Sequence, residues 1–525
     1  MNFFRLFILK NFYLALFFLT SIFFLYSLYI LQFHYDGHHI GLMYSNALDF
    51  NKGKLPYKEI FIQYGLLTTI IHSVTLDLFD NNIFSLSIIT LTFYQLSILL
   101  ISLTINNLIN KEYAIISYLI LLMNHPIPWL PWSNYIAFFF ITLGIFLLTK
   151  RNKNFFVIGV VFSLIFLSRQ DYLIAITTSI ICIVLFLFIK KKETHFKNTI
   201  AIISGFSFPI FIFLIYLSIN SIFFEWSALL QLPNFYLEIY QTNIHQLIKD
   251  FIIFFISESF FKFIVTPQYF LISIILISNT VFIIMKILKK IEMDNTIFFI
   301  SIFCLFLSSM SLKIELFRLY TSVSIGVIPL FYFINRIHLT DLRKKIIMVL
   351  FLPSLFAFIF YPLGNNPIFS KINFQLINID HNLNQFKHHK WSLKKTSTLN
   401  KINELTMHCK VSYLENLTFD ALYSTIGNFN RIRLLPYVKS SMKDSKLTFF
   451  LDNIKNSNEN FVSLINSEIT KKNIIVLINE GNNSFATQRI IFNTDYSVFE
   501  LNLNSDLQKP NILRIYMPKN CINKI

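Results

Sequence analysis

The stretch FHYDGHHIGL, residues 33–42, places groups that could do chemistry directly after a long apolar run. It contains a carboxylate, Asp36, and the neighbouring imidazoles of His38 and His39. A carboxylate in this position could act as a general base on a hydroxyl acceptor. The plainer alternative is that Asp36 only marks the end of a membrane segment. Neighbouring histidines cannot share one face of a strand, so we predict no metal ligand set and leave a divalent cation open as a cofactor.

Further polar and aromatic side chains lie in other gaps between apolar runs. The first gap, 33–82, also holds Glu59 and Tyr64, and the later gaps hold Trp129 and Trp132 (124–134), Arg169 and Asp171 (SRQDY, 168–172), Glu225, Trp226 and Glu238 (220–268), and Lys313, Glu315 and Arg318 (311–318). Tryptophan can lie flat on a sugar ring, but it is also the usual anchor at a membrane boundary. The two charges of SRQDY could simply pair with each other, and those of 311–318 could be solvated.

The composition predicts that these gaps connect membrane helices. Of the 525 residues 54% are hydrophobic and only 14% charged, whereas a soluble domain has about 25% charged residues. The net charge of +17 comes largely from Lys and Arg in short gaps between apolar runs. That distribution is typical of cytoplasmic loops, so we expect no nucleic-acid partner.

Eleven apolar runs are candidate membrane spans, because a helix needs about 20 apolar residues to cross a bilayer. They are 8–32, 83–106, 113–124, 134–149, 155–168, 172–189, 199–219, 269–288, 296–311, 318–335 and 346–361. The basic gaps alternate with the polar ones, which places the N-terminus in the cytoplasm and the five gaps named above, together with the C-terminus, outside. The run 251–265 is interrupted by Glu258 and Lys262, and we interpret it as a helix lying on the outer membrane surface.

The chain becomes polar after residue 361, and short strand-like runs at 473–480 and 512–518 alternate with helical patterns. The predicted fold is an all-α polytopic membrane bundle (1–361) of about 11 transmembrane helices, a linker (362–389) and a small extracytoplasmic α/β domain (390–525). Cys409 and Cys521 could form a disulfide in such a domain.

The first outer gap resembles that of GT-C glycosyltransferases, especially bacterial family 39-type members, which take sugars from polyprenyl-phosphate carriers. The resemblance starts from Asp36 just after the first span and continues through NALDFNKGKLPYKEIFIQYGLLTT (46–69). In that stretch a G-x-x-P-Y element and a following Y-G occur as Gly53, Pro56 and Tyr57, then Tyr64 and Gly65. Many relatives carry two adjacent acids where this chain has Asp36 and Gly37.

The resemblance implies a multi-pass enzyme of the bacterial cytoplasmic (inner) membrane that transfers a sugar at the outer face during cell-envelope glycan biosynthesis. Its partners would be a polyprenyl-phosphate-linked sugar donor, the lipid bilayer and a glycan, lipid or protein acceptor. Asp36 would be the catalytic base, and Arg169, Lys313 or Arg318 would hold the carrier phosphate. The other outer-face groups would bind substrate: His38, His39, Glu59, Tyr64, Trp129, Trp132, Asp171 and Glu315.

Three other functions share the membrane bundle. One, a structural membrane protein with a periplasmic docking domain, leaves the first outer gap unexplained. A transporter or flippase of lipid-linked glycans predicts polar groups near the bilayer midplane, where this chain has few. A glycan polymerase or ligase predicts its chemistry in one large later loop, and the only candidate loop, 220–268, contains no arginine.

Overall fold

The computed structural model describes most of the first 365 residues and five strands beyond them. The described residues are 10–31, 37–58, 60, 62, 64–124, 130–189, 193–229, 267–288, 290–309, 316–365, 411–416, 430–434, 474–480, 496–502 and 511–522. The chain divides into two compact units. The first comprises residues 1–29, 62–68 and 88–375, and the second comprises 30–61, 69–87 and 376–525.

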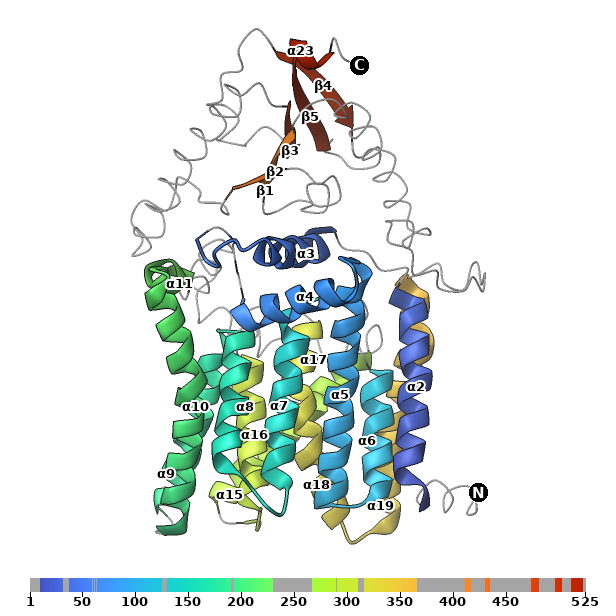
Figure 1. The fold of residues 1–525 in the computed structure, drawn as a ribbon. Helices are drawn as coiled ribbons and strands as arrows, with labels where there is room; N and C mark the ends of the chain where they lie inside the picture. The colour runs from blue at the N-terminus through green and yellow to red at the C-terminus, as the bar shows by residue number, and fades with distance from the viewer. Residues whose placement is uncertain are drawn as a thin grey trace. The chain divides into compact units, whose positions relative to one another are not determined.

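The first unit is a bundle of apolar helices, and each of the eleven expected spans coincides with a helical segment (Figure 1). The segments are α2 (Phe12–Leu31), α5 (Phe84–Leu108), α6 (Lys111–Met123), α7 (Ser133–Thr149), α8 (Phe155–Ser168), α9 (Tyr172–Ile189), α10 (Glu193–Ile219), α15 (Pro267–Ile287), α16 (Asn295–Ser309), α17 with α18 (Leu316–Val323, Val327–Arg336) and α19 (Thr340–Asn365). Among the described residues three helices are long and apolar enough to cross a bilayer by themselves: Phe84–Leu108, Lys197–Ile219 and Gln268–Ile287. The number of crossings remains a prediction.

The outer surface of the bundle is apolar. On α10 the side chains of Phe208, Phe211 and Ile212 are exposed, and on α2 so are those of Phe17 and Ile22. Rows of exposed large apolar side chains are unusual on soluble proteins and are what a lipid environment favours.

The expected span 318–335 is not one continuous helix. A 3₁₀ turn, η2 (Ser324–Gly326), separates α17 from α18. The carbonyl oxygen of Gly326 accepts a hydrogen bond of 3.0 Å from Asn279 Nδ2, so a side chain of α15 satisfies backbone that the break exposes.

The first outer gap contains two helices where we expected a single loop. They are α3 (Gly37–Asn51), in the second unit, and α4 (Leu66–Leu78), which belongs to the second unit from residue 69 on. Asn51 Nδ2 connects them by donating to the carbonyl oxygen of Ser73 over 3.2 Å. The G-x-x-P-Y element directly follows α3. It needs its glycine, because Gly53 has a φ of +77°, which side-chain-bearing residues rarely adopt.

The second unit also contains a five-stranded mixed sheet with strand order β2-β1-β3-β5-β4. Its strands are β1 (Val411–Asn416), β2 (Asn430–Leu434), β3 (Ile474–Glu480), β4 (Tyr496–Asn502) and β5 (Asn511–Pro518), followed by the short helix α23 (Lys519–Ile522). β1 pairs in parallel with β2 and β3, whereas β5 is antiparallel to β3 and β4. The strand runs expected at 473–480 and 512–518 are therefore strands β3 and β5.

Cys521 is disulfide-bonded, while Cys182 and Cys304 are free. Cys409 lies outside the described residues. The boundaries of the C-terminal domain and its extracytoplasmic location remain predictions, and the surface helix expected at 251–265 lies outside the described residues.

Candidate functional site

A helical hairpin brings two separate polar segments to one end of the bundle. α7 and α8 pack against each other and are joined by only the short segment 150–154, so they run antiparallel. The first turn of α7 therefore lies near the last turn of α8. Asn134 stands on the former, and Arg169 directly follows the latter.

Arg169 is held by a two-pronged ion pair with Asp171. Its Nε lies 2.8 and 3.0 Å from the two carboxylate oxygens, and its Nη2 lies 2.8 Å from Oδ2. The guanidinium carbon also lies 4.8 Å from the ring centre of Tyr172 and 5.7 Å from that of Tyr64. Two carboxylate contacts and two aromatic faces leave the planar group only one orientation.

This charge is buried, since only 4% of Arg169 is exposed. Burial lowers the pKa of the Arg169 guanidinium, but the Asp171 carboxylate together with Tyr172 and Tyr64 raises it, so the net pKa lies above its ordinary value. Arg169 is therefore a permanent cation within the protein.

The third branch of the guanidinium reaches α7. Nη1 of Arg169 donates to Oδ1 of Asn134, which is itself 2% exposed. The residue before this helix is Trp132, whose indole N–H can only donate and so cannot cap the N–H groups of the first turn. The N-terminus of α7 thus presents donors next to a buried cation.

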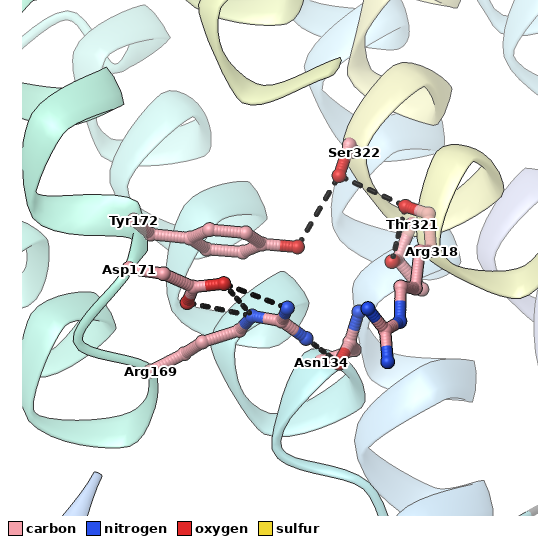
Figure 2. A network of polar contacts seen from close by, with 7 residues as sticks. All are labelled: Asn134, Arg169, Asp171, Tyr172, Arg318, Thr321 and Ser322. Carbon is pink, nitrogen blue, oxygen red and sulfur yellow. Dashed lines mark hydrogen bonds and ion pairs between the residues drawn. The ribbon is translucent and has the colours of Figure 1, made fainter. Parts of the chain in front are cut away.

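α17 packs against α7 and adds a third segment. The hydroxyl groups of Tyr172 and Ser322 lie 3.2 Å apart, and Ser322 Oγ donates to the carbonyl oxygen of Arg318 over 2.9 Å. Figure 2 shows the side chain of Arg318 extending along the Asn134 side of this network. The start of α7, the SRQDY turn and α17 are far apart in the sequence, but they form one cluster. The cluster contains two guanidinium groups, those of Arg169 and Arg318.

The end of the first outer gap is docked on the same SRQDY turn. The backbone N–H of Gly65 and the hydroxyl of Thr68 both donate to the carbonyl oxygen of Ser168, at 3.0 and 2.9 Å. Gln170 Nε2 donates to the carbonyl oxygen of Tyr64 over 2.6 Å. The same amide accepts from the indole N–H of Trp226 on α11 (Phe223–Leu229) at 2.9 Å, so Gln170 links three segments.

The structure brings four of the predicted site residues together: Tyr64, Arg169, Asp171 and Arg318. Trp132 is buried beside Asn134 at the start of α7. His38 and His39 lie in the first turn of α3, and nothing about their side chains is described. Asp36, Glu59, Trp129, Lys313 and Glu315 lie outside the described residues.

Asn134, Gln170 and Ser322 belong to the cluster but were not singled out from the sequence. The sequence could have indicated Asn134 as a site residue, because a polar Ser-Asn pair begins a very apolar run. Gln170 lies inside the quoted SRQDY motif. Nothing in the sequence indicated Ser322 as a site residue, since serine is common within the apolar runs of this chain.

The groups in this cluster are chemically suited to binding an anion. Two guanidinium groups, an amide and a helix N-terminus all favour negative charge. Among the described residues no group of three or more His, Cys, Asp or Glu could hold a metal ion. Asp36 and the side chains of His38 and His39 are not among the described parts of the chain.

Comparisons with known proteins identify the fold. No family model and no curated protein matches the sequence. The solved structure of ArnT from Cupriavidus metallidurans bound to undecaprenyl phosphate matches with a TM-score of 0.57 at 10% identity, over 96% of this chain and 98% of that one. The apo structure of the same ArnT matches with a TM-score of 0.56 at 8% identity, over 98% and 99%.

The alignments span nearly the whole of both chains, so the likeness is to the complete architecture and not to a shared helical hairpin. An identity of 8–10% supports a statement about fold, and this agrees with the resemblance seen in the first outer gap. The chain therefore has the fold seen in the two ArnT structures.

Proposed function

We propose that this protein is a membrane glycosyltransferase that moves a sugar from a polyprenyl-phosphate carrier to an acceptor at the outer face of the cytoplasmic membrane. The observation that carries the proposal is a cluster of Arg169 and Arg318 at one end of a bundle whose fold matches an ArnT structure with undecaprenyl phosphate bound. A carrier of this kind has an apolar tail for the lipid and one phosphate for a cationic site. The acceptor is a surface glycan, a lipid or a protein.

The cations suit the leaving group. In this reaction the bond between the anomeric carbon and the phosphate oxygen breaks, and the phosphate keeps the electron pair. Arginine can hold two phosphate oxygens at once and remains charged throughout, so it stabilises the negative charge without supplying a proton. We assign this role to Arg318 and Lys313, with Arg169 beside them.

The acceptor side needs a base. We assign it to Asp36, which would take the proton of the acceptor hydroxyl while that oxygen attacks the anomeric carbon. Attack opposite the leaving phosphate inverts the configuration at that carbon. His38, His39, Glu59, Tyr64, Trp129, Trp132, Asp171 and Glu315 would line the sugar and acceptor sites, and a divalent cation is not required by this scheme.

The test is sugar transfer in isolated membranes supplied with a panel of polyprenyl-phosphate sugars. The wild-type chain is compared with Asp36→Asn, which keeps the shape of the side chain and removes its basicity. We expect transfer by the wild type and a loss of about 10²–10⁴-fold in the variant. Asp80→Asn is the matched control, because it makes the same chemical change in the same gap at a turn with a φ of +48°, which asparagine tolerates.

Equal rates in the wild type and Asp36→Asn would remove Asp36 from catalysis. No transfer from any donor, together with a surface-glycan defect in cells lacking the protein, would favour a transporter or a polymerase instead.

A further inference from the structure

The first turn of α7 contains donors that the protein itself does not use. Among the described residues Asn134 Nδ2 and Ser133 Oγ have no hydrogen-bond partner, although both atoms are buried. Their residues are 2% and 0% exposed. Buried polar atoms are normally paired, so an unused amide N–H₂ next to a helix N-terminus indicates a place for an acceptor from outside the chain.

The orientation of this amide is fixed. Arg169 Nη1 can only donate, so the atom of Asn134 facing it must be the carbonyl oxygen. The N–H₂ of Asn134 is therefore turned away from Arg169. Because Arg169 is itself fixed by the two oxygens of Asp171, the chain Asp171–Arg169–Asn134 sets the direction of the Asn134 donor.

The arrangement also separates the roles of the two arginines. Arg169 uses Nε and Nη2 on Asp171 and Nη1 on Asn134. Arg318 reaches the cluster from α17 and extends along the Asn134 side (Figure 2). A ligand beside Arg318 would meet the Nδ2 of Asn134 and the N-terminus of α7, which both donate.

We propose that Asn134 is a ligand of the carrier phosphate, donating from Nδ2 to a phosphate oxygen beside Arg318, and that Arg169 is a positioning residue that acts through Asn134. The proposal rests on the proposed function for the identity of the ligand. A phosphate diester, such as a polyprenyl-phosphate sugar, fits because its two free oxygens carry no proton at neutral pH and accept hydrogen bonds from these donors.

The experiment measures binding rather than transfer, so that it does not depend on the sugar or the acceptor. The purified full chain in detergent is titrated with a short-chain polyprenyl phosphate, with the corresponding polyprenol and with inorganic phosphate. Asn134→Asp keeps the oxygen that Arg169 holds and replaces the donor by a negative oxygen. We expect its Kd for the polyprenyl phosphate to rise at least 10-fold and its Kd for the polyprenol to stay unchanged.

Asn154→Asp is the matched control. Asn154 caps α8 through its Oδ1, which accepts from the N–H of Val157, and an aspartate caps equally well. This variant adds the same charge at the opposite end of the α7–α8 hairpin, and its Kd for the polyprenyl phosphate should equal that of the wild type.

A double-mutant cycle tests the role of Arg169. Arg169→Lys cannot hold both Asp171 and Asn134, so we expect it to weaken polyprenyl phosphate binding in the wild-type background. In the Asn134→Asp background it should weaken binding no further. Effects that multiply would show that Arg169 contacts the phosphate itself and would overturn its positioning role.

A folded Asn134→Asp variant with wild-type affinity for the polyprenyl phosphate would overturn the proposal. If Asn134→Asp does not fold, Ser133→Ala and Asn134→Ser take its place, and wild-type affinity in both has the same meaning. Binding of inorganic phosphate with the same dependence on Asn134 would overturn the lipid source of the phosphate and leave an anion site. Carrier binding that depends on Asn134 in a protein without transferase activity would support this inference while the proposed function fails.

Discussion

The buried guanidinium of Arg169 explains why the SRQDY turn has its sequence. Taking a charge out of water costs several kcal/mol, and only a close counter-charge with good hydrogen-bond geometry offsets this cost. Asp171 supplies that geometry from two residues along the chain, with a shortest distance of 2.8 Å to Nη2. The pair is therefore built within one turn and does not depend on the rest of the bundle.

Removing the carboxylate charge should destabilise the protein more than the pair is worth by itself, because the buried cation is left uncompensated. We expect Asp171→Asn to lower the free energy of unfolding by about 2–4 kcal/mol. The measurement is thermal unfolding of the purified protein in detergent, with the exposed Asp80→Asn as the control. An unchanged melting temperature in Asp171→Asn would mean that the Arg169 charge is balanced by another group.

At the scale of elements, the Y-G pair Tyr64 and Gly65 lets the end of the first outer gap pack against the SRQDY turn. Gly65 approaches the SRQDY turn so closely that a Cβ there would lie 1.9 Å from the carbonyl oxygen of Leu167 and 2.5 Å from the carbonyl carbon of Ser168. Only glycine allows the N–H of residue 65 to reach the oxygen of Ser168. The motif thus joins the end of the first gap to the turn that carries Arg169.

Gly65→Ala should lift this segment from the turn, because the obstacle is backbone and cannot rotate away. We expect a loss of about 1–3 kcal/mol in stability and, if the proposed function holds, a loss of transfer activity as well. Gly144→Ala is the comparison, since its Cβ would meet a side-chain atom of Phe162, 2.7 Å away, and not the backbone. Equal effects of the two substitutions would contradict a special role for the docking of Gly65.

The elements also show how far the sequence could predict this fold. The apolar runs correspond to helices because a membrane segment must be apolar over most of its surface, which a single sequence records directly. α3 and α4 were missed because their apolar and polar residues are mixed, as in any segment that is only partly buried. The break at η2 was missed because its partner, Asn279, comes from another helix.

In the candidate site, the sequence indicated the contact between neighbouring residues but not the contact between distant ones. The pairing of Arg169 with Asp171 was one of two alternatives from the sequence, because the two residues are local. The contact of Arg169 with Asn134 joins residues 35 positions apart and depends on the antiparallel packing of α7 and α8. Asn134 looked in the sequence like an ordinary polar residue at the start of a span. We therefore did not predict the ligand role that we now propose for it.

At the scale of the whole molecule, the proposed chemistry requires that the end of the bundle carrying Arg169 and Asn134 faces outward. Lys150, Arg151 and Lys153 are exposed in the segment that joins α7 and α8, at the other end of both helices. Basic residues in short loops remain on the cytoplasmic side. The hairpin thus has one end expected in the cytoplasm and one end expected outside.

Cysteine labelling in intact cells tests this orientation together with the number of spans. Cysteines are introduced one at a time at Lys153, at Asp80 and after Ile525, in a chain whose four native cysteines are replaced by Ser. Intact cells are treated with a maleimide that does not cross the cytoplasmic membrane. We expect labelling at position 80 and at the C-terminus, and labelling at position 153 only after the membrane is permeabilised. The three positions distinguish an error in the orientation of the bundle from an error in the number of spans.

Labelling at 153 but not at 80 would mean that the bundle has the opposite orientation. The arginine cluster would then lie in the cytoplasm, where a carrier-linked sugar destined for the outer face would not be used. Labelling at 80 without labelling at the C-terminus would keep the cluster outside but require an even number of spans, and the five-stranded sheet would then act in the cytoplasm.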